Sequence, residues 1–107
     1  SVLASHPAVR YALAIPFENR YYGEEVAAYV VPNAPVTEEE ILAHCARYLD
    51  YARRPKVVVF GDDVPYTATG KAKRLELKKR LAERLADYRD VQFRRSRTAG
   101  DLDTSPP

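Results

Sequence analysis

The residues with the clearest potential for chemistry lie in one loop, residues 64–74, which reads VPYTATGKAKR. Pro65 restricts the backbone ahead of the loop tip, and Gly70 removes side-chain crowding beside Lys71. A lysine ammonium is a compact charge with three donors on a flexible stem, so it can reach out to an anion. We therefore predict that the loop offers Lys71 to a phosphate or a carboxylate.

The Gly70–Lys71 pair does not belong to a Walker phosphate-binding loop. That motif needs a glycine five positions before Gly70 and a serine or threonine directly after the lysine. Pro65 and Ala72 occupy those two positions. Taken alone, the short motif is also compatible with an ordinary solvated lysine, which composition by itself favours.

Length and composition indicate a single globular domain. The chain has 107 residues, of which 46% are hydrophobic and 30% charged, and its formal net charge is +2. That charge is too small to predict nucleic-acid binding by itself. Its distribution is uneven, because residues 71–97 contain eleven Lys or Arg and only four acids. One end of the domain should therefore attract phosphates or carboxylates.

Other function classes find little support in the sequence. The single cysteine, Cys45, excludes an internal disulfide and is compatible with the cytoplasmic location that we expect. No apolar run approaches the ~20 residues of a membrane span, and no signal peptide is recognisable. His6 and His44 lack the spacing of a metal site, so we expect none.

The sequence contains three short apolar runs that predict strands, at residues 9–15, 26–31 and 56–60. The segment 16–23 contains a proline, an asparagine and a glycine, so we expect a turn there. A connection this short favours antiparallel pairing of the first two strands.

Two longer segments have the periodicity of amphipathic helices. Thr37 and Glu40 form a capping box ahead of the first helix, which should run to about Asp50. The second helix should cover about residues 73–88. The apolar stripes are Ile41, Leu42, Cys45, Tyr48 and Leu49 in the first helix, and Leu77, Leu81, Leu85 and Tyr88 in the second.

These elements predict an α+β fold in which helices cover a small three-stranded sheet, built from an antiparallel pair and a third strand. Residues 2–5 should form a last helical turn ahead of the sheet, so the order is (α)-β-β-α-β-α. We expect a folded domain over residues 1–90 and a polar, flexible tail over residues 91–107.

The loop and the start of the second helix resemble the final core motif of the adenylate-forming superfamily. This superfamily includes acyl- and aryl-CoA synthetases, firefly luciferase and peptide-synthetase adenylation domains. Further matches follow in order upstream, and the resemblance covers about residues 1–88. Tyr66 stands where the family usually has Arg or Lys. The matching motif residues are Pro65, Thr67, Thr69, Gly70, Lys71, Arg74, Leu77 and Lys78.

The resemblance implies the small C-terminal cap of an ATP-dependent acyl-CoA synthetase. Its partner would be a larger N-terminal adenylation domain, which holds the carboxylic acid and most of the site for ATP and Mg²⁺. The carboxylate first displaces pyrophosphate from ATP to give an acyl-adenylate, and coenzyme A then displaces AMP. The cap rotates between these halves, and the isolated cap is expected to be inactive.

The family's functional positions imply two groups of site residues. Lys71 would be the adenylation lysine, because an ammonium offsets the negative charge that builds where two anions meet. Thr69 and Gly70 would lie beside it at the nucleotide. Tyr22 would line the pantetheine path, and Arg54 and Lys56 would meet CoA phosphates. The competing interpretation of this cationic run is simple solvation.

Two alternatives stay open from the sequence. The first is an adenylation domain that loads a carrier protein in place of free CoA, although the cationic residues 53–56 favour CoA. The second is a small basic module that binds nucleic acid or an acidic partner. That module would need exposed aromatic rings among its basic residues, and support for it is thin. We therefore expect no nucleic-acid partner.

Overall fold

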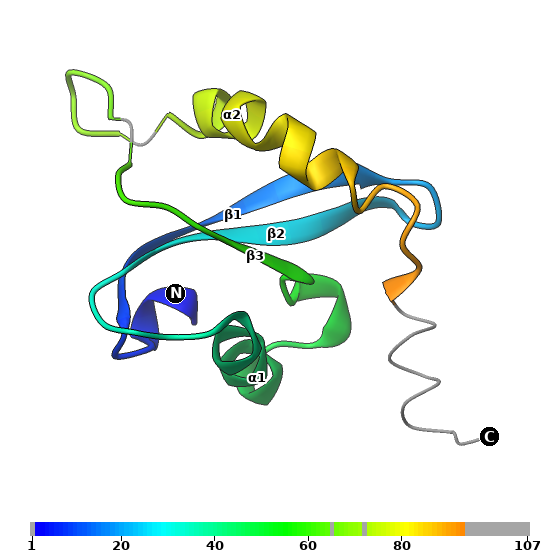
Figure 1. Ribbon diagram of the computed structural model, residues 1–107, viewed down its shortest axis with the longest axis horizontal. Helices are drawn as coiled ribbons and strands as arrows, with labels where there is room; N and C mark the ends of the chain where they lie inside the picture. The colour runs from blue at the N-terminus through cyan, green and yellow to red at the C-terminus, as the bar shows by residue number, and fades with distance from the viewer. Residues whose placement is uncertain (1, 65, 72, 94–107) are drawn as a thin grey trace.

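The computed structural model describes residues 2–64, 66–71 and 73–93, and the remaining residues, including 94–107 of the expected tail, lie outside that description. Figure 1 shows the expected α+β architecture and its element order. The elements are the 3-10 turns η1 (Leu3–Ser5) and η2 (Tyr51–Arg53), the strands β1 (Val9–Asn19), β2 (Gly23–Pro32) and β3 (Val57–Phe60), and the helices α1 (Glu38–Tyr48) and α2 (Arg74–Ala86).

The three described strands form a mixed sheet in the order β1-β2-β3. Strands β1 and β2 pair antiparallel as a hairpin, as expected, whereas β3 runs parallel to β2, with Ala27 opposite Val57. In a parallel pair the two strands begin at the same end of the sheet. This arrangement decides which loops share an end of the molecule.

The expected turn over residues 16–23 is wrong in its first half. Strand β1 continues through Pro16 to Asn19, and the turn is confined to residues 20–22. Proline lacks a backbone N–H and is therefore tolerated on an edge strand, which is where β1 lies. The alternating burial of residues 13, 15 and 17 continues across the proline, so the strand keeps one face in the core.

Helices cover the two faces of the sheet separately. Helix α2 lies on one face, and α1 with η1 lies on the other (Figure 1). Side chains of β2 alternate between the two cores, with Tyr29 packing toward α2 and Val30 toward α1. The α2 stripe expected from the sequence is buried through Leu77, Leu81 and Leu85.

Helix α1 begins with the expected capping box. Glu40 N–H donates to Thr37 Oγ1 at 3.2 Å, and Thr37 N–H donates to Glu40 Oε1 at 3.0 Å. The expected apolar stripe is correct for Ile41 and Cys45, which are fully buried. It is wrong for Tyr48, which is 64% exposed and whose ring lies edge-on to the ring of His44 on the same helix.

The C-terminal segment after α2 returns to the core. The ring of Phe93 lies edge-on to the buried ring of Phe17, with centroids 6.2 Å apart, and it stacks with the ring of Tyr88. Residues 91–93 are therefore half-buried against the domain. Across the described ranges, neither helix combines the length and apolar character that a bilayer crossing requires.

Candidate functional site

Backbone hydrogen bonds close the loop that carries Lys71. Thr67 N–H donates to the Lys71 carbonyl at 2.8 Å, and Gly70 N–H donates to the Thr67 carbonyl at 2.9 Å. Lys71 N–H donates to Thr67 Oγ1 at 3.1 Å, and the hydroxyls of Thr67 and Thr69 share a hydrogen bond of 3.0 Å. Thr67 therefore organises the turn that presents the lysine.

Gly70 has φ +87°, a left-handed conformation that glycine adopts without steric cost. Thr69, Gly70 and Lys71 are all exposed. The Lys71 ammonium makes no hydrogen bond or ion pair with any other residue in the described ranges. The turn therefore holds an unpaired cation at the surface, as the loop composition predicts.

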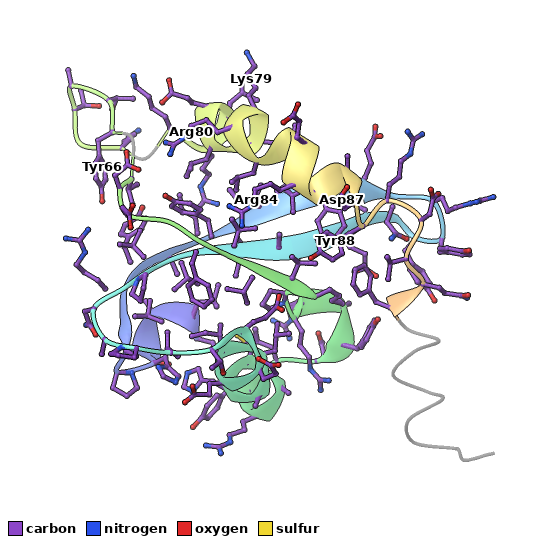
Figure 2. All side chains as sticks on the ribbon, viewed as in Figure 1. Tyr66, Lys79, Arg80, Arg84, Asp87 and Tyr88 are labelled. Carbon is purple, nitrogen blue, oxygen red and sulfur yellow. The ribbon has the colours of Figure 1, made fainter. Side chains whose placement is uncertain are left out.

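Contacts to both sides attach the loop to the fold. At its start, the Tyr66 ring lies edge-on to the Tyr11 ring of β1, with centroids 5.9 Å apart. Burial and the proximity of Tyr66 raise the pKa of Tyr11. Beyond the loop, Arg74 donates to the Ala14 carbonyl at 3.2 Å. Figure 2 shows Tyr66 and Arg80 at this same end of the molecule, far from Tyr88.

The other three candidate residues lie at the opposite end of the sheet. Tyr22 directly precedes β2, and Arg54 and Lys56 directly precede β3. Because β2 and β3 are parallel, these residues share one end, whereas the Lys71 loop follows the far end of β3 (Figure 1). The structure thus divides the candidate residues into two separate sets.

Lys56 does not face solvent as the cationic run suggests. Its side chain is only 5% exposed, and its Nζ atom lies 3.0 Å from Glu25 Oε1. The same ammonium donates to the carbonyls of Tyr51 and Arg54, each at 2.8 Å. It also lies 4.4 Å from the centre of the Tyr51 ring. A direct contact of Lys56 with a phosphate would require these interactions to open.

Arg54 is half-buried and held at one nitrogen. Its Nε atom donates to the Leu49 carbonyl at 2.7 Å, and its terminal nitrogens have no partner among residues 2–64, 66–71 and 73–93. The neighbouring Arg53 is exposed and hydrogen-bonds to Asp50, which lowers the pKa of that carboxyl group. A shallow, largely apolar hollow of about 260 Å³ lies beside Arg54 and Tyr51.

Tyr22 lies in the β1–β2 turn and is 38% exposed. Asn19 orders this turn, because its Oδ1 accepts from the N–H groups of Tyr21 at 3.0 Å and Tyr22 at 3.3 Å. Its Nδ2 donates to the carbonyls of Tyr88 at 3.2 Å and Val91 at 2.8 Å. Asn19 therefore fastens the turn to the segment that follows α2.

Sequence reasoning missed two residues of the candidate sites. From the sequence, Asn19 is expected to break the strand at a turn, and no partner is predicted for Glu25. The signal for Asn19 is its position at the end of a long alternating strand, directly before a turn. Glu25 stands among apolar residues at the start of β2, where a buried acid implies a buried cationic partner.

The histidines serve a structural connection between α1 and η1. His44 Nε2 lies 2.9 Å from both Ser5 Oγ and the Val2 carbonyl oxygen, and its ring contacts that of His6. Within the described residues, no three potential metal-ligating side chains gather into one cluster.

Comparison with known proteins places this geometry in context. A long-chain-fatty-acid–CoA ligase of Yersinia pestis is 42% identical over 78 residues, which are 72% of this chain and 14% of that protein. A Mycobacterium tuberculosis fatty acyl CoA synthetase superimposes with a TM-score of 0.73 at 28% identity, over 78% of this chain and 17% of its own.

A double mutant of o-succinylbenzoate CoA synthetase from Bacillus subtilis, bound with its product analogue, superimposes with a TM-score of 0.69. The identity is 36%, over 72% of this chain and 16% of that chain. The present chain therefore spans less than a fifth of the length of these relatives. The model of the AMP-binding enzyme C-terminal domain matches residues 1–71. The chain accordingly belongs to the family of C-terminal domains of AMP-binding enzymes.

Proposed function

We propose that this chain acts as the mobile C-terminal cap of an ATP-dependent acyl-CoA synthetase and supplies Lys71 to the adenylation step. The observation that carries the proposal is the exposed Lys71 ammonium, which has no partner in the described part of the chain and lies on a turn closed by Thr67 and Gly70. The named activity of its relatives supports the reaction class, because the Yersinia protein is a CoA ligase.

In the first half-reaction, a carboxylate oxygen attacks the α-phosphorus of ATP while the bond to pyrophosphate breaks. Two anions approach, and negative charge builds on the α-phosphate oxygens. Lys71 would contact these oxygens and the carboxylate, so its charge is most stabilising where the new charge develops. Thr69 and Gly70 would approach the same nucleotide. The N-terminal domain would select the acid and bind most of the ATP with Mg²⁺.

In the second half-reaction, the CoA thiol attacks the acyl carbon and releases AMP. The separation of the two candidate sets supports a rotation of the cap, because one rigid domain cannot direct both ends at a single reaction centre. Arg54 is suited to a CoA phosphate, since its terminal nitrogens have no partner in the described part of the fold. Tyr22 would border the pantetheine chain.

The carrier-protein alternative is less well supported than free CoA. A pantetheine arm attached to a protein lacks the nucleotide phosphates that a guanidinium recognises, and the relatives compared above are CoA ligases or synthetases. The cytoplasmic location expected from the single cysteine remains part of this proposal.

The basic-module alternative loses its stacking residues in this fold. Lys79 projects outward from α2 in Figure 2, and Arg80 binds Asp63 at 3.3 Å. However, the rings of Tyr88 and Phe93 are half-buried against Phe17, which leaves less of their surface for stacking on bases. We do not retain nucleic acid as a candidate partner.

The decisive experiment compares Lys71→Ala with Lys79→Ala in the ligase that carries this domain. Lys79 is an exposed lysine of α2, so its replacement removes the same charge outside the loop. We expect Lys71→Ala to slow carboxylate-dependent exchange of pyrophosphate into ATP by about 10²–10³-fold. Thioester formation from supplied acyl-adenylate should change far less, and Lys79→Ala should preserve both rates.

Equal losses in the two half-reactions of Lys71→Ala would contradict the proposed role, because they would indicate a general defect of the cap. A rate of pyrophosphate exchange equal to that of the unmodified ligase would contradict it as well.

A further inference from the structure

A buried ion pair lies next to the residue that we assign to the CoA phosphate. Lys56 precedes β3 and Glu25 lies on β2, and their side chains are 5% and 6% exposed. Charged side chains that are buried to this extent occur in folded proteins only with close partners. The ion pair links this end of the sheet to the turn η2, and Arg54 is the residue directly after that turn.

The Lys56 ammonium has no donor left for a ligand. A lysine ammonium has three N–H donors. One faces Glu25 Oε1 at 3.0 Å, and the carbonyl oxygens of Tyr51 and Arg54 accept at 2.8 Å each. The Tyr51 ring lies against the same ammonium. Every direction of donation is therefore occupied from within the domain.

These same contacts determine the shape of the turn. The two carbonyl groups belong to Tyr51, the first residue of η2, and to Arg54, which directly follows its last residue. Both carbonyl groups accept from the one ammonium that also contacts Glu25. The path of the chain from residue 51 to residue 54 therefore depends on the ion pair. A second contact then orients the side chain, because Arg54 Nε donates to the Leu49 carbonyl at 2.7 Å.

We propose that Lys56 and Glu25 act as positioning residues for Arg54, and that Arg54, not Lys56, contacts the CoA phosphate. The inference rests on the proposed function and deepens it. A guanidinium has five N–H donors in a rigid fork, and the contact that Arg54 makes within the described residues engages only Nε. Its terminal nitrogens therefore remain available to a phosphate, in an orientation that the turn decides.

The test compares four variants of the ligase that carries this domain. Lys56→Met and Glu25→Gln each break the pair from one side, and the combination of Lys56→Met with Glu25→Leu replaces it by apolar side chains that should fold. Arg54→Ala removes the proposed phosphate contact. Lys79→Met is the matched control, because Lys79 is an exposed lysine at a distance from η2 (Figure 2).

Two measurements separate positioning from direct contact. Amide hydrogen exchange at Arg53 and Arg54, whose N–H groups donate to the Asp50 carbonyl at 3.2 Å, reports the order of the turn without any substrate. The second measurement is the KM for CoA, which is compared with the KM for dephospho-CoA and with the rate of pyrophosphate exchange. It reports whether a change in the turn weakens the interaction with CoA.

We expect faster exchange in all three variants of the pair and a KM for CoA raised about tenfold, as in Arg54→Ala, with pyrophosphate exchange preserved. The double variant should be no worse than either single variant, because the pair acts as one unit. The Lys79→Met control should match the unmodified ligase in every measurement.

A lower KM for CoA in Glu25→Gln would overturn the inference. If Lys56 bound phosphate directly, removal of the competing carboxylate would lower the KM for CoA and only Lys56→Met would raise it. Unchanged amide exchange in the double variant would overturn the inference whatever happens to CoA. Faster exchange in the double variant with an unchanged KM would reject the positioning role, while a raised KM in Arg54→Ala keeps the proposed function. An unchanged KM in Arg54→Ala would instead reject the CoA role itself.

Discussion

The hydroxyl group of Tyr29 occupies the space in which residue 61 would carry a side chain. A Cβ atom on Gly61 would lie 2.0 Å from Tyr29 Oη and 2.4 Å from the adjoining ring carbon. Tyr29 is 2% exposed, and its hydroxyl donates to the Asp63 carbonyl. The central strand thus reaches beneath the segment that leads into the Lys71 loop, and only a glycine at position 61 permits this approach.

The first prediction concerns this contact. Gly61→Ala should destabilise the domain by about 1–3 kcal/mol, because the methyl group overlaps a buried ring that has no space to move. The measurement is the urea midpoint of the chain. Gly23→Ala is a useful comparison, since its Cβ would meet no atom within 4 Å and only the backbone at φ +77° resists it. An unchanged midpoint in Gly61→Ala would show that the Tyr29 ring does not hold this position.

The second prediction separates the conformation of the loop from its charge. A Cβ on Gly70 would touch nothing within 4 Å. The cost of Gly70→Ala therefore comes only from the left-handed backbone conformation at φ +87°, and it is about 1–2 kcal/mol. We expect slower pyrophosphate exchange with a small change in melting temperature, because the turn re-forms and Lys71 shifts. Gly70→Asn should recover part of the rate, since asparagine tolerates this conformation. Equal rates for the Ala and Asn variants would argue against a conformational cause.

The third prediction addresses the turn that carries Tyr22. Asn19 is 3% exposed and makes two accepted and two donated hydrogen bonds to backbone groups. Asn19→Ala should lower stability by about 2–4 kcal/mol, because several buried backbone groups lose their partners. Asn19→Asp keeps the acceptor for Tyr21 and Tyr22 but turns a carboxylate oxygen toward two carbonyl oxygens in a buried site, so its melting temperature should fall at least as far as that of Asn19→Ala. A neutral effect of Asn19→Ala would contradict the bridge to Tyr88.

The fourth prediction concerns pH. Cys45 is fully buried, and burial raises the pKa of its thiol above the ordinary value. The unfolded thiol ionises from about pH 8.5 and the folded thiol only at higher pH. The resulting contribution to stability is complete below the unfolded pKa and is lost as pH rises through the folded pKa. Cys45→Ala should therefore lose less stability between pH 7 and pH 10 than the unmodified chain.

The accessibility of Cys45 gives the same prediction a second measurement. Its reaction with a thiol reagent at neutral pH should follow global unfolding, and should become rapid only in denaturant. Fast labelling of the native chain would contradict the burial of this side chain on α1.

Local features of the sequence predicted most elements correctly because their causes lie within a few residues. The capping box of α1 depends on Thr37 and Glu40, which are three positions apart, and both of its hydrogen bonds are present. The α2 stripe follows helical spacing and is buried. The same logic failed at Pro16, where the tolerance for proline depends on the strand lying at the sheet edge.

The family motif, the α+β order of elements and the turn in which Gly70 leaves Lys71 exposed can all be predicted from residue type and short-range spacing. Only contacts between distant parts of the chain turn Lys56 inward and leave the terminal nitrogens of Arg54 without a partner in the described residues, although both cations lie in one short run. This difference arises because the parallel pairing of β3 with β2 brings Glu25 next to Lys56 from a distant part of the chain, and the buried carboxylate forms an ion pair with that ammonium.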